Sequence, residues 1–183
     1  MSDDGPSIDT PRLLLRRPRI ADFDRFAELS AHGDAARYIG GPVVREAAWR
    51  RFLQQPGAWM LQGFGMFSVV DKASGRWIGQ MGPWRPEGWP GNEIGYAFHP
   101  DAWGHGYAVE SATAAIDWSF ETLGWDDIIH CIDPGNLASQ RVAQRLGSTL
   151  LRPGRLPPPF EDARVDIWGQ TRAQWRARVA PRG

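Results

Sequence analysis

Hydrophobic and polar positions along this chain show two periodicities, one typical of strands and one typical of helices. Short apolar runs bounded by turn residues predict strands, and apolar residues spaced three and four apart predict helices. The predicted strands span 13–15, 64–71, 76–81, 93–98, 127–133 and 165–171. The predicted helices span 20–30, 44–55, 108–123 and 137–146, and a basic tail helix begins near 172. The expected order is β-α-α-β-β-β-α-β-α-β-β, in which one of the last two strands has no assigned bounds. This order predicts an α/β (α+β mixed sheet) fold with an antiparallel first half and a strand–helix–strand second half.

The second predicted helix, over 44–55, has an apolar side and a polar side. Its apolar residues Trp49, Phe52 and Leu53 are expected to face the core. Pro56 follows the helix and is expected to end it, because proline lacks the N–H that the next helical hydrogen bond needs.

The composition is that of a single globular domain spanning residues 1–183, in which residues 1–9 are expected to form a flexible N-terminus. Acidic and basic residues balance at 21 each, so no net charge draws the chain to nucleic acid or to a membrane surface. Cys131 is the only cysteine, which excludes an intrachain disulfide and suits a reducing compartment. No run approaches the ~20 apolar residues of a membrane span, and the acidic start does not resemble a signal peptide. A cytoplasmic protein without a metal is expected.

Ten tryptophans are a heavy load for this length. Most are expected in the core, because an indole buries a large apolar area. Trp84 and Trp89 differ, since they flank the turn-rich segment 85–88. There they can either line a ligand pocket or cap an edge of the core.

Two glycines lie where a strand must turn into a helix, in the segment Trp103-Gly104-His105-Gly106-Tyr107-Ala108-Val109-Glu110. The first N–H groups of a helix lack intrahelical partners, and the helix dipole is positive there. Without side chains at the two glycines, a phosphate group can approach these N–H groups closely. The alternative is a tight turn without a ligand. No Lys-Ser/Thr pair follows the glycines and no third glycine completes a dinucleotide fingerprint, so neither of those phosphate-binding loops is indicated.

The segment Glu93-Ile94-Gly95-Tyr96, the glycine segment, and Asn136-Leu137-Ala138-Ser139 with Arg145-Leu146-Gly147 occur in this order at separations that resemble the GNAT superfamily of acyl-CoA-dependent N-acyltransferases. The resemblance covers nearly the whole chain and is strongest to the branch that acetylates the N-termini of ribosomal proteins. It implies a single GNAT-like domain with a splayed central strand pair. The pantetheine arm of acetyl-CoA would insert there, between the strand of Tyr96 and the strand at 128–132.

The resemblance also implies which residues hold acetyl-CoA. Main-chain groups of the strand would pair with pantetheine, and the N–H groups of 104–109 would hold the pyrophosphate. The implied residues are Tyr96, Phe98, Trp103, Gly104, His105, Gly106, Tyr107, Ala108, Val109, Asn136 and Ser139. Trp103 departs from the family pattern, which often has Gln or Arg there. Asn136 is equally a plausible helix N-cap, with Ser139 a harmless residue in the first turn.

Acetyl transfer to an amine needs a base for the amine proton and a donor for the departing thiolate. Many relatives use a tyrosine as the donor, at the position that is Ala143 here. Ser139 is the substitute that the resemblance implies. Glu93 on the splayed strand is the candidate base, directly or through water, and its alternative is a salt-bridged strand carboxylate. His130 and Asp133 are weaker candidates for the base.

The sequence therefore predicts an acetyl-CoA-dependent N-acetyltransferase whose acceptor is a primary amine, either a protein N-terminus or a small molecule. The alternative is a non-catalytic acyl-CoA-binding module. The loops 84–91 and 152–164 are expected to wall the acceptor site with charges of both signs, from Arg85, Glu87, Arg152, Arg155, Glu161 and Asp162. A homodimer is left open.

Overall fold

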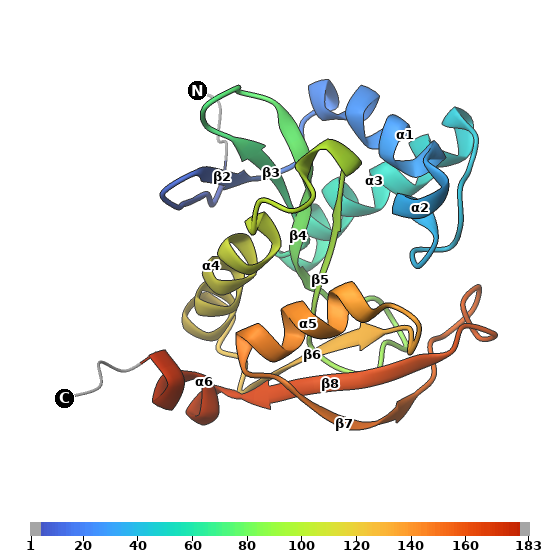
Figure 1. The fold of residues 1–183 in the computed structure, drawn as a ribbon. Helices are drawn as coiled ribbons and strands as arrows, with labels where there is room; N and C mark the ends of the chain where they lie inside the picture. Colours follow the sequence, from blue (N-terminus) through green and yellow to red (C-terminus); the bar gives the residue numbers. More distant parts are fainter. Residues whose placement is uncertain (1–4, 180–183) are drawn as a thin grey trace.

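The computed structural model describes residues 5–179 as one sheet with helices on both faces (Figure 1). Its strands are β1 (Ile8–Asp9), β2 (Leu13–Arg16), β3 (Phe67–Asp71), β4 (Trp77–Trp84), β5 (Glu93–Phe98), β6 (Asp127–Ile132), β7 (Thr149–Gly154) and β8 (Val165–Thr171). Its helices are η1 (Ile20–Asp22), α1 (Phe23–Ala31), α2 (Gly33–Ala36), α3 (Arg45–Gln62), η2 (Pro100–Ala102), α4 (Tyr107–Thr122), α5 (Leu137–Leu146) and α6 (Arg172–Val179). No helix among these is long and apolar enough to cross a membrane.

The strands follow the spatial order β1-β2-β3-β4-β5-β6-β8-β7, and every neighbouring pair is antiparallel except β5 and β6. The parallel pair is in register only at Glu93 and Ile129, where Ile129 N donates to Asn92 O at 2.9 Å. Beyond that point the two strands diverge. The mixed α/β sheet and the splayed strand pair predicted from the sequence are confirmed.

Successive side chains of β4 point to opposite faces of the sheet, as the period of two in a strand requires, and they contribute to a hydrophobic core on each face. Ile78 belongs to the main cluster, which contains the buried face of α4 with Ile116 and Phe120. Trp77 belongs to a second cluster with α1 and α3. In Figure 1, α1–α3 lie together at one end of the view and α5 runs across β6 and β8. The helices thus leave the splayed pair at the centre of the molecule.

The helix α3 differs from the prediction, because it continues through Pro56 to Gln62. Proline removes one helical hydrogen bond, but the helix beyond it is held by Trp59, whose buried indole donates to Met66 O at 3.0 Å. Phe52 is buried as expected, whereas Trp49 and Leu53 are 38% and 45% exposed. The prediction that these two face the core is wrong, since the buried face follows positions 48, 52, 55 and 59.

Smaller differences lie at the ends of strands. β4 reaches Trp84, so that residue is the end of a strand and not part of a loop. β7 takes up the beginning of the segment 152–164 that was expected to be a loop. Ile8 and Asp9 form the short strand β1, and residues 1–4 of the expected flexible N-terminus lie outside the described residues. The tail helix is confirmed as α6.

The tail helix supplies the first test, because Trp175 on α6 is 1% exposed and its indole N–H donates to Asp117 Oδ1 at 2.6 Å. Trp175→Ala should lower the free energy of unfolding by about 3–5 kcal/mol, since it empties a large core position. Met60→Ala, at a side chain that is 86% exposed, should change it by less than about 0.5 kcal/mol. Urea denaturation of both variants measures the difference, and equal effects would contradict the packing described for α6.

Candidate functional site

The strands β5 and β6 separate because side chains replace a hydrogen bond between their backbones. One more rung of a regular parallel ladder would join Cys131 N–H to Ile94 C=O. Instead, Cys131 N donates to Glu93 Oε1 at 3.1 Å, and Ile94 O accepts from His130 Nδ1 at 2.8 Å. Both backbone groups are therefore satisfied without direct pairing. We call this pair of side-chain bonds the strand wedge.

His130 belongs to a buried polar chain on one face of the sheet. Its Nε2 lies 3.2 Å from Ser148 Oγ, and Gln170 Nε2 donates to the same hydroxyl at 3.0 Å. Nδ1 donates to the Ile94 carbonyl, which can only accept. Burial holds the pKa of His130 below its usual value, which favours the neutral ring, and in that ring Nε2 accepts a hydrogen bond from the Ser148 hydroxyl. Both ring nitrogens are thus engaged within the chain, and His130 acts as a structural bridge between β5 and Ser148.

Glu93 lies at the point where the strands part, and it is 7% exposed. Burial raises the pKa of its carboxyl to about 7, against the opposing hydrogen bonds from Cys131 N and Trp89. Trp89 Nε1 donates to Glu93 Oε2 at 2.5 Å. Among the described residues Glu93 has no ion-pair partner, so the salt-bridge alternative is wrong. A carboxyl with this pKa can accept a proton near neutral pH.

The helix α5 begins beside the splay. Asn136 is its N-cap, with Oδ1 accepting from Ser139 N at 3.1 Å, so the capping interpretation of Asn136 is confirmed. Asp133 Oδ1 accepts from Gly135 N at 2.7 Å and so belongs to the turn before the helix. Ala143 lies in a small cluster with Ile132 and Trp168. The position of the usual tyrosine is thus filled by core packing.

A tyrosine of β5, Tyr96, nevertheless lies beside Ser139 at the start of α5. The hydroxyl of Tyr96 is buried and has no hydrogen-bond partner among the described residues. Burial raises the pKa of Tyr96 to about 12, with the neighbouring Ser139 side chain acting in the opposite direction. Sequence reasoning used only the main chain of Tyr96 and missed its phenol. The sequence signal that could have found it was Ala143. Because the usual tyrosine is absent there, a tyrosine elsewhere near the splayed pair, such as Tyr96 on its first strand, was the candidate to consider.

The glycine segment has the backbone conformation that glycine permits. Gly104 and Gly106 have φ of +80° and +77°, and a side chain at Gly104 would enter open space. Gly106 is the N-cap of α4 and provides no side-chain cap, so the first N–H groups of a 16-residue helix remain available to an anion. His105 is exposed and stacks on Tyr107 at 5.4 Å. This segment fits a phosphate group.

The indole of Trp103 contacts the end of β5. Its Nε1 donates to Phe98 O at 3.0 Å, which gives this departure from the family pattern a structural role. One main-chain acceptor of the strand is therefore already bonded within the chain. A carbonyl oxygen has two lone pairs, so Phe98 O retains one for a further donor.

An ion pair from the first hairpin holds the glycine segment in place. Glu110 accepts hydrogen bonds from Thr10 Oγ1 at 2.7 Å and from Arg12 N and Nε at 2.9 and 2.6 Å. Arg12 Nη1 also donates to His105 O at 2.9 Å. Burial opposes ionisation of Glu110, but these hydrogen bonds outweigh it and keep its pKa below the usual value. Sequence reasoning missed this clamp, which also sets the positive charge of Arg12 beside the helix N-terminus.

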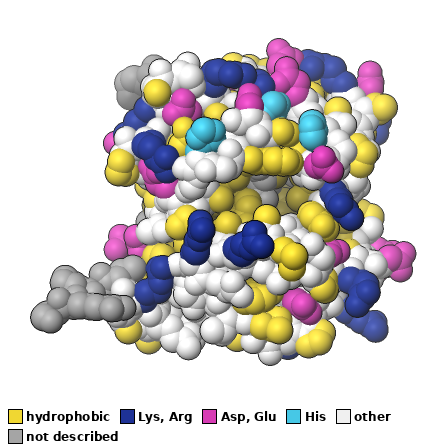
Figure 2. Space-filling model, in the orientation of Figure 1, with side chains coloured by type: hydrophobic (Ala, Val, Ile, Leu, Met, Phe, Trp, Pro, Cys, Tyr) yellow, Lys and Arg dark blue, Asp and Glu magenta, His cyan; other side chains and the backbone are white. Residues whose placement is uncertain are grey.

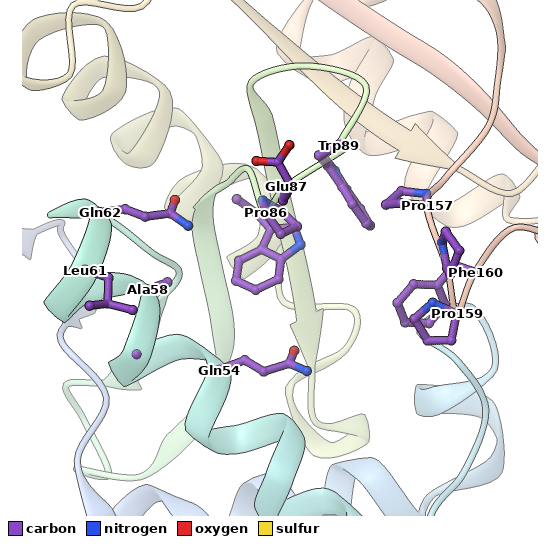
Figure 3. Close-up of a pocket in the computed structure, with 13 residues that line it drawn as sticks. Gln54, Ala58, Leu61, Gln62, Pro86, Glu87, Trp89, Pro157, Pro159 and Phe160 are labelled. Carbon is purple, nitrogen blue, oxygen red and sulfur yellow. The ribbon is translucent and has the colours of Figure 1, made fainter.

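A cavity of about 420 Å³ lies between α3, the β4–β5 loop and the β7–β8 loop (Figure 3). Trp84 and Trp89 both line it, as the ligand-pocket interpretation of these tryptophans requires. Of the six charged residues expected in the wall of the acceptor site, Glu87 lines this cavity and the other five do not. Arg85 is directed elsewhere, with Nη1 donating to Asn92 Oδ1 at 2.9 Å. Figure 2, in the orientation of Figure 1, shows a hollow across the middle of the molecule with hydrophobic side chains in its floor.

Comparisons with known proteins agree with this geometry. The family model described as "Acetyltransferase (GNAT) domain" matches residues 12–149. The uncharacterized protein YkkB of Bacillus subtilis is 40% identical over 87 residues, covering 46% of this chain and about half, 51%, of that protein. The structure of an acetyltransferase from Agrobacterium tumefaciens has a TM-score of 0.81 at 29% identity, covering 92% of this chain and 95% of that one. A ribosomal-protein alanine acetyltransferase from Vibrio fischeri shares the fold, with a TM-score of 0.68 at 19% identity and coverage of 93% and 99%.

The glycine segment provides a matched test, because Gly106 and Gly124 have nearly the same positive φ, +77° and +69°, at the two ends of α4. Valine at either position should cost about 1–2 kcal/mol of stability, from the left-handed conformation. Only Gly106→Val should also weaken binding of acetyl-CoA, because its side chain would stand among the N–H groups that hold the pyrophosphate. Calorimetric titration of both folded variants measures this difference. Unchanged affinity in Gly106→Val would place the phosphate site elsewhere.

Proposed function

The chain belongs to the GNAT family of acetyltransferases, and from this we propose that it transfers the acetyl group of acetyl-CoA to a primary amine. One observation carries the proposal: a buried carboxyl with a pKa of about 7 lies where the two splayed strands part. In this proposal the pantetheine arm extends along β5 and the pyrophosphate lies at the N-terminus of α4. The thioester would then lie near Glu93 on one side and the start of α5 on the other.

Glu93 acts as the base in this proposal. An amine is mostly protonated at neutral pH and cannot attack a carbonyl until it loses a proton. Glu93 accepts that proton, directly or through a water molecule, and the free amine attacks the thioester carbonyl carbon. A C–N bond forms, the C–S bond breaks, and the electron pair leaves with sulfur as the CoA thiolate. The nitrogen, which carries a positive charge after the attack, loses its second proton to water and becomes the neutral amide.

Ser139 and Tyr96 form the donor side. The thiolate takes the proton of the Ser139 hydroxyl, and the phenol of Tyr96 replaces that proton in turn. Tyr96 then takes a proton from water and Glu93 releases one to water, which returns both groups to their starting states. The buried hydroxyl of Tyr96 supports this role, because it has no partner within normal hydrogen-bond geometry among the described residues, while the Ser139 side chain lies close enough to lower its pKa. The pKa of about 12 keeps Tyr96 protonated at neutral pH, as a donor must be.

A non-catalytic acyl-CoA-binding module is the second candidate function. Ala143 favours it, since the usual donor is absent. The candidate base Glu93 together with the phenol of Tyr96 beside Ser139 favours the enzyme, because separation of the strands alone requires no proton donor at this place.

Glu93→Gln tests the base and the function together. With a panel of primary amines, kcat/KM from thiol release at neutral pH should fall by about 10²–10⁴-fold. In the unaltered protein kcat/KM should rise with pH through about 7, as Glu93 ionises, and the variant should lack this rise. Glu121→Gln, at an exposed carboxylate on α4, is the control and should keep the normal profile.

Stability gives Glu93 an independent readout. A carboxyl whose pKa is raised in the folded state holds its proton more tightly there than in the unfolded chain. Folding therefore loses stability as pH rises from about 4.5, the ordinary value for Glu, towards about 7. This loss should be absent in Glu93→Gln when melting is followed against pH. Parallel pH–rate profiles of the two proteins would remove Glu93 as the base.

Tyr96→Phe and Ser139→Ala test the donor side. Each should lower kcat, by up to about 10²-fold, while the affinity for acetyl-CoA stays within a few-fold. Because the two act in one relay, the double variant should be little worse than either single variant. Tyr96→Phe removes an unpartnered hydroxyl, so its melting temperature should be equal or higher. Full turnover in both single variants would leave Ser139 with a structural role alone.

A further inference from the structure

The 420 Å³ cavity has an unusual lining for a site that receives an amine. Two indoles, one phenyl ring, four prolines and one leucine make up most of it. In Figure 3, Trp89, Phe160 and Pro159 stand on one side of the cavity, and Leu61 with Ala58 stands opposite. Neither the Trp84 indole nor the Phe160 ring stacks on another ring in the part of the chain that the structure describes. These surfaces are free for an apolar body.

The cavity is directly linked to the candidate base. Trp84 and Glu93 are register partners on the antiparallel strands β4 and β5, so their side chains lie on the same face of the sheet. Trp89 lines the cavity and donates to Glu93 Oε2 at 2.5 Å. Glu93 is not itself among the residues that line the cavity, so the Trp89 indole is the contact through which an amine bound there would be linked to the carboxyl.

The polar groups of the lining are few. Among the residues that the structure describes, Glu87 is the one charged side chain of the lining, and Gln54 and Gln62 add two amides. A single ammonium group would be bound favourably here, through the Glu87 carboxylate and through the faces of the indole rings, which attract cations. A second or third ammonium group would lose hydration against prolines without a partner. A peptide backbone would leave most of its donors and acceptors unpaired here.

We propose that the acceptor is a small monoamine with an apolar, preferably aromatic, body held between Trp84, Trp89 and Phe160. This inference rests on the proposed acetyltransferase function and names its substrate class. It separates the chain from transferases that act on polycations or on protein N-termini. In this arrangement Trp84 and Phe160 determine the choice of acceptor, and Glu93 serves the reaction common to all primary amines.

A matched panel of acceptors tests the class. At saturating acetyl-CoA and one pH, kcat/KM from thiol release is measured for 2-phenylethylamine, ethylamine, spermidine and a short peptide with a free N-terminus. The expected order places 2-phenylethylamine first, by about 10- to 100-fold over ethylamine, because burial of the ring adds to binding. Spermidine or the peptide in first place overturns the proposal and leaves the acetyltransferase function intact.

Two tryptophan variants locate the effect. Trp84→Ala should raise KM for 2-phenylethylamine by about tenfold or more and leave KM for ethylamine within about threefold. Trp49→Ala is the control, since Trp49 is also partly exposed but lies outside the cavity lining. A loss that is equal for both amines, or equal in both variants, overturns the assignment of the cavity.

Direct binding separates failure of this inference from failure of the function. 2-Phenylethylamine is titrated calorimetrically into the protein saturated with CoA, and into Trp84→Ala. Binding that Trp84→Ala abolishes supports the cavity's selectivity even if no amine releases thiol, an outcome that would overturn the acetyltransferase function alone. Absence of binding to the unaltered protein overturns the inference.

Discussion

The strand wedge is the interaction on which the other features of the site depend. Two neighbouring parallel strands normally satisfy one another, and each buried backbone group left without a partner costs about 1–3 kcal/mol. By bonding Cys131 N–H to Glu93 and Ile94 C=O to His130, the chain separates β5 and β6 without that cost. The gap can then hold an extended substrate, and the carboxyl that holds it open is also the one next to the cavity.

Glu93 is subject to two opposing effects on its pKa that a surface carboxylate does not experience together. Burial between strands favours its neutral form, while hydrogen bonds from Cys131 N and Trp89 favour its ionised form. The balance of these opposing effects places its pKa near neutral, where a small change in surroundings shifts a large fraction of the protons. A substrate that displaces water from the cavity acts on the same balance.

Local sequence signals predicted the elements whose ends have local causes. The helix α5 begins and ends where predicted, because Asn136 caps it and Gly147 ends it at a φ of +89°. The end of α3 was not predictable from Pro56, because the continuation depends on the contact of Trp59 with Met66 across a turn. The burial of Glu93, the phenol of Tyr96 and the apolar cavity wall depend on segments distant in sequence. The spacing of the motifs indicated the family and the glycine segment, but it does not show which residues from distant parts of the chain contact those motifs.

The clamp between Arg12 and Glu110 joins residues 98 positions apart. Closing so long a loop has an entropic cost that is recovered only when the intervening chain has folded. The geometry of the glycine segment therefore depends on residues of the first hairpin as well as on its own sequence. A fragment that contained only the family motifs, from β5 to α5, would lack Thr10 and Arg12 and so would leave Glu110 without the donors that hold it.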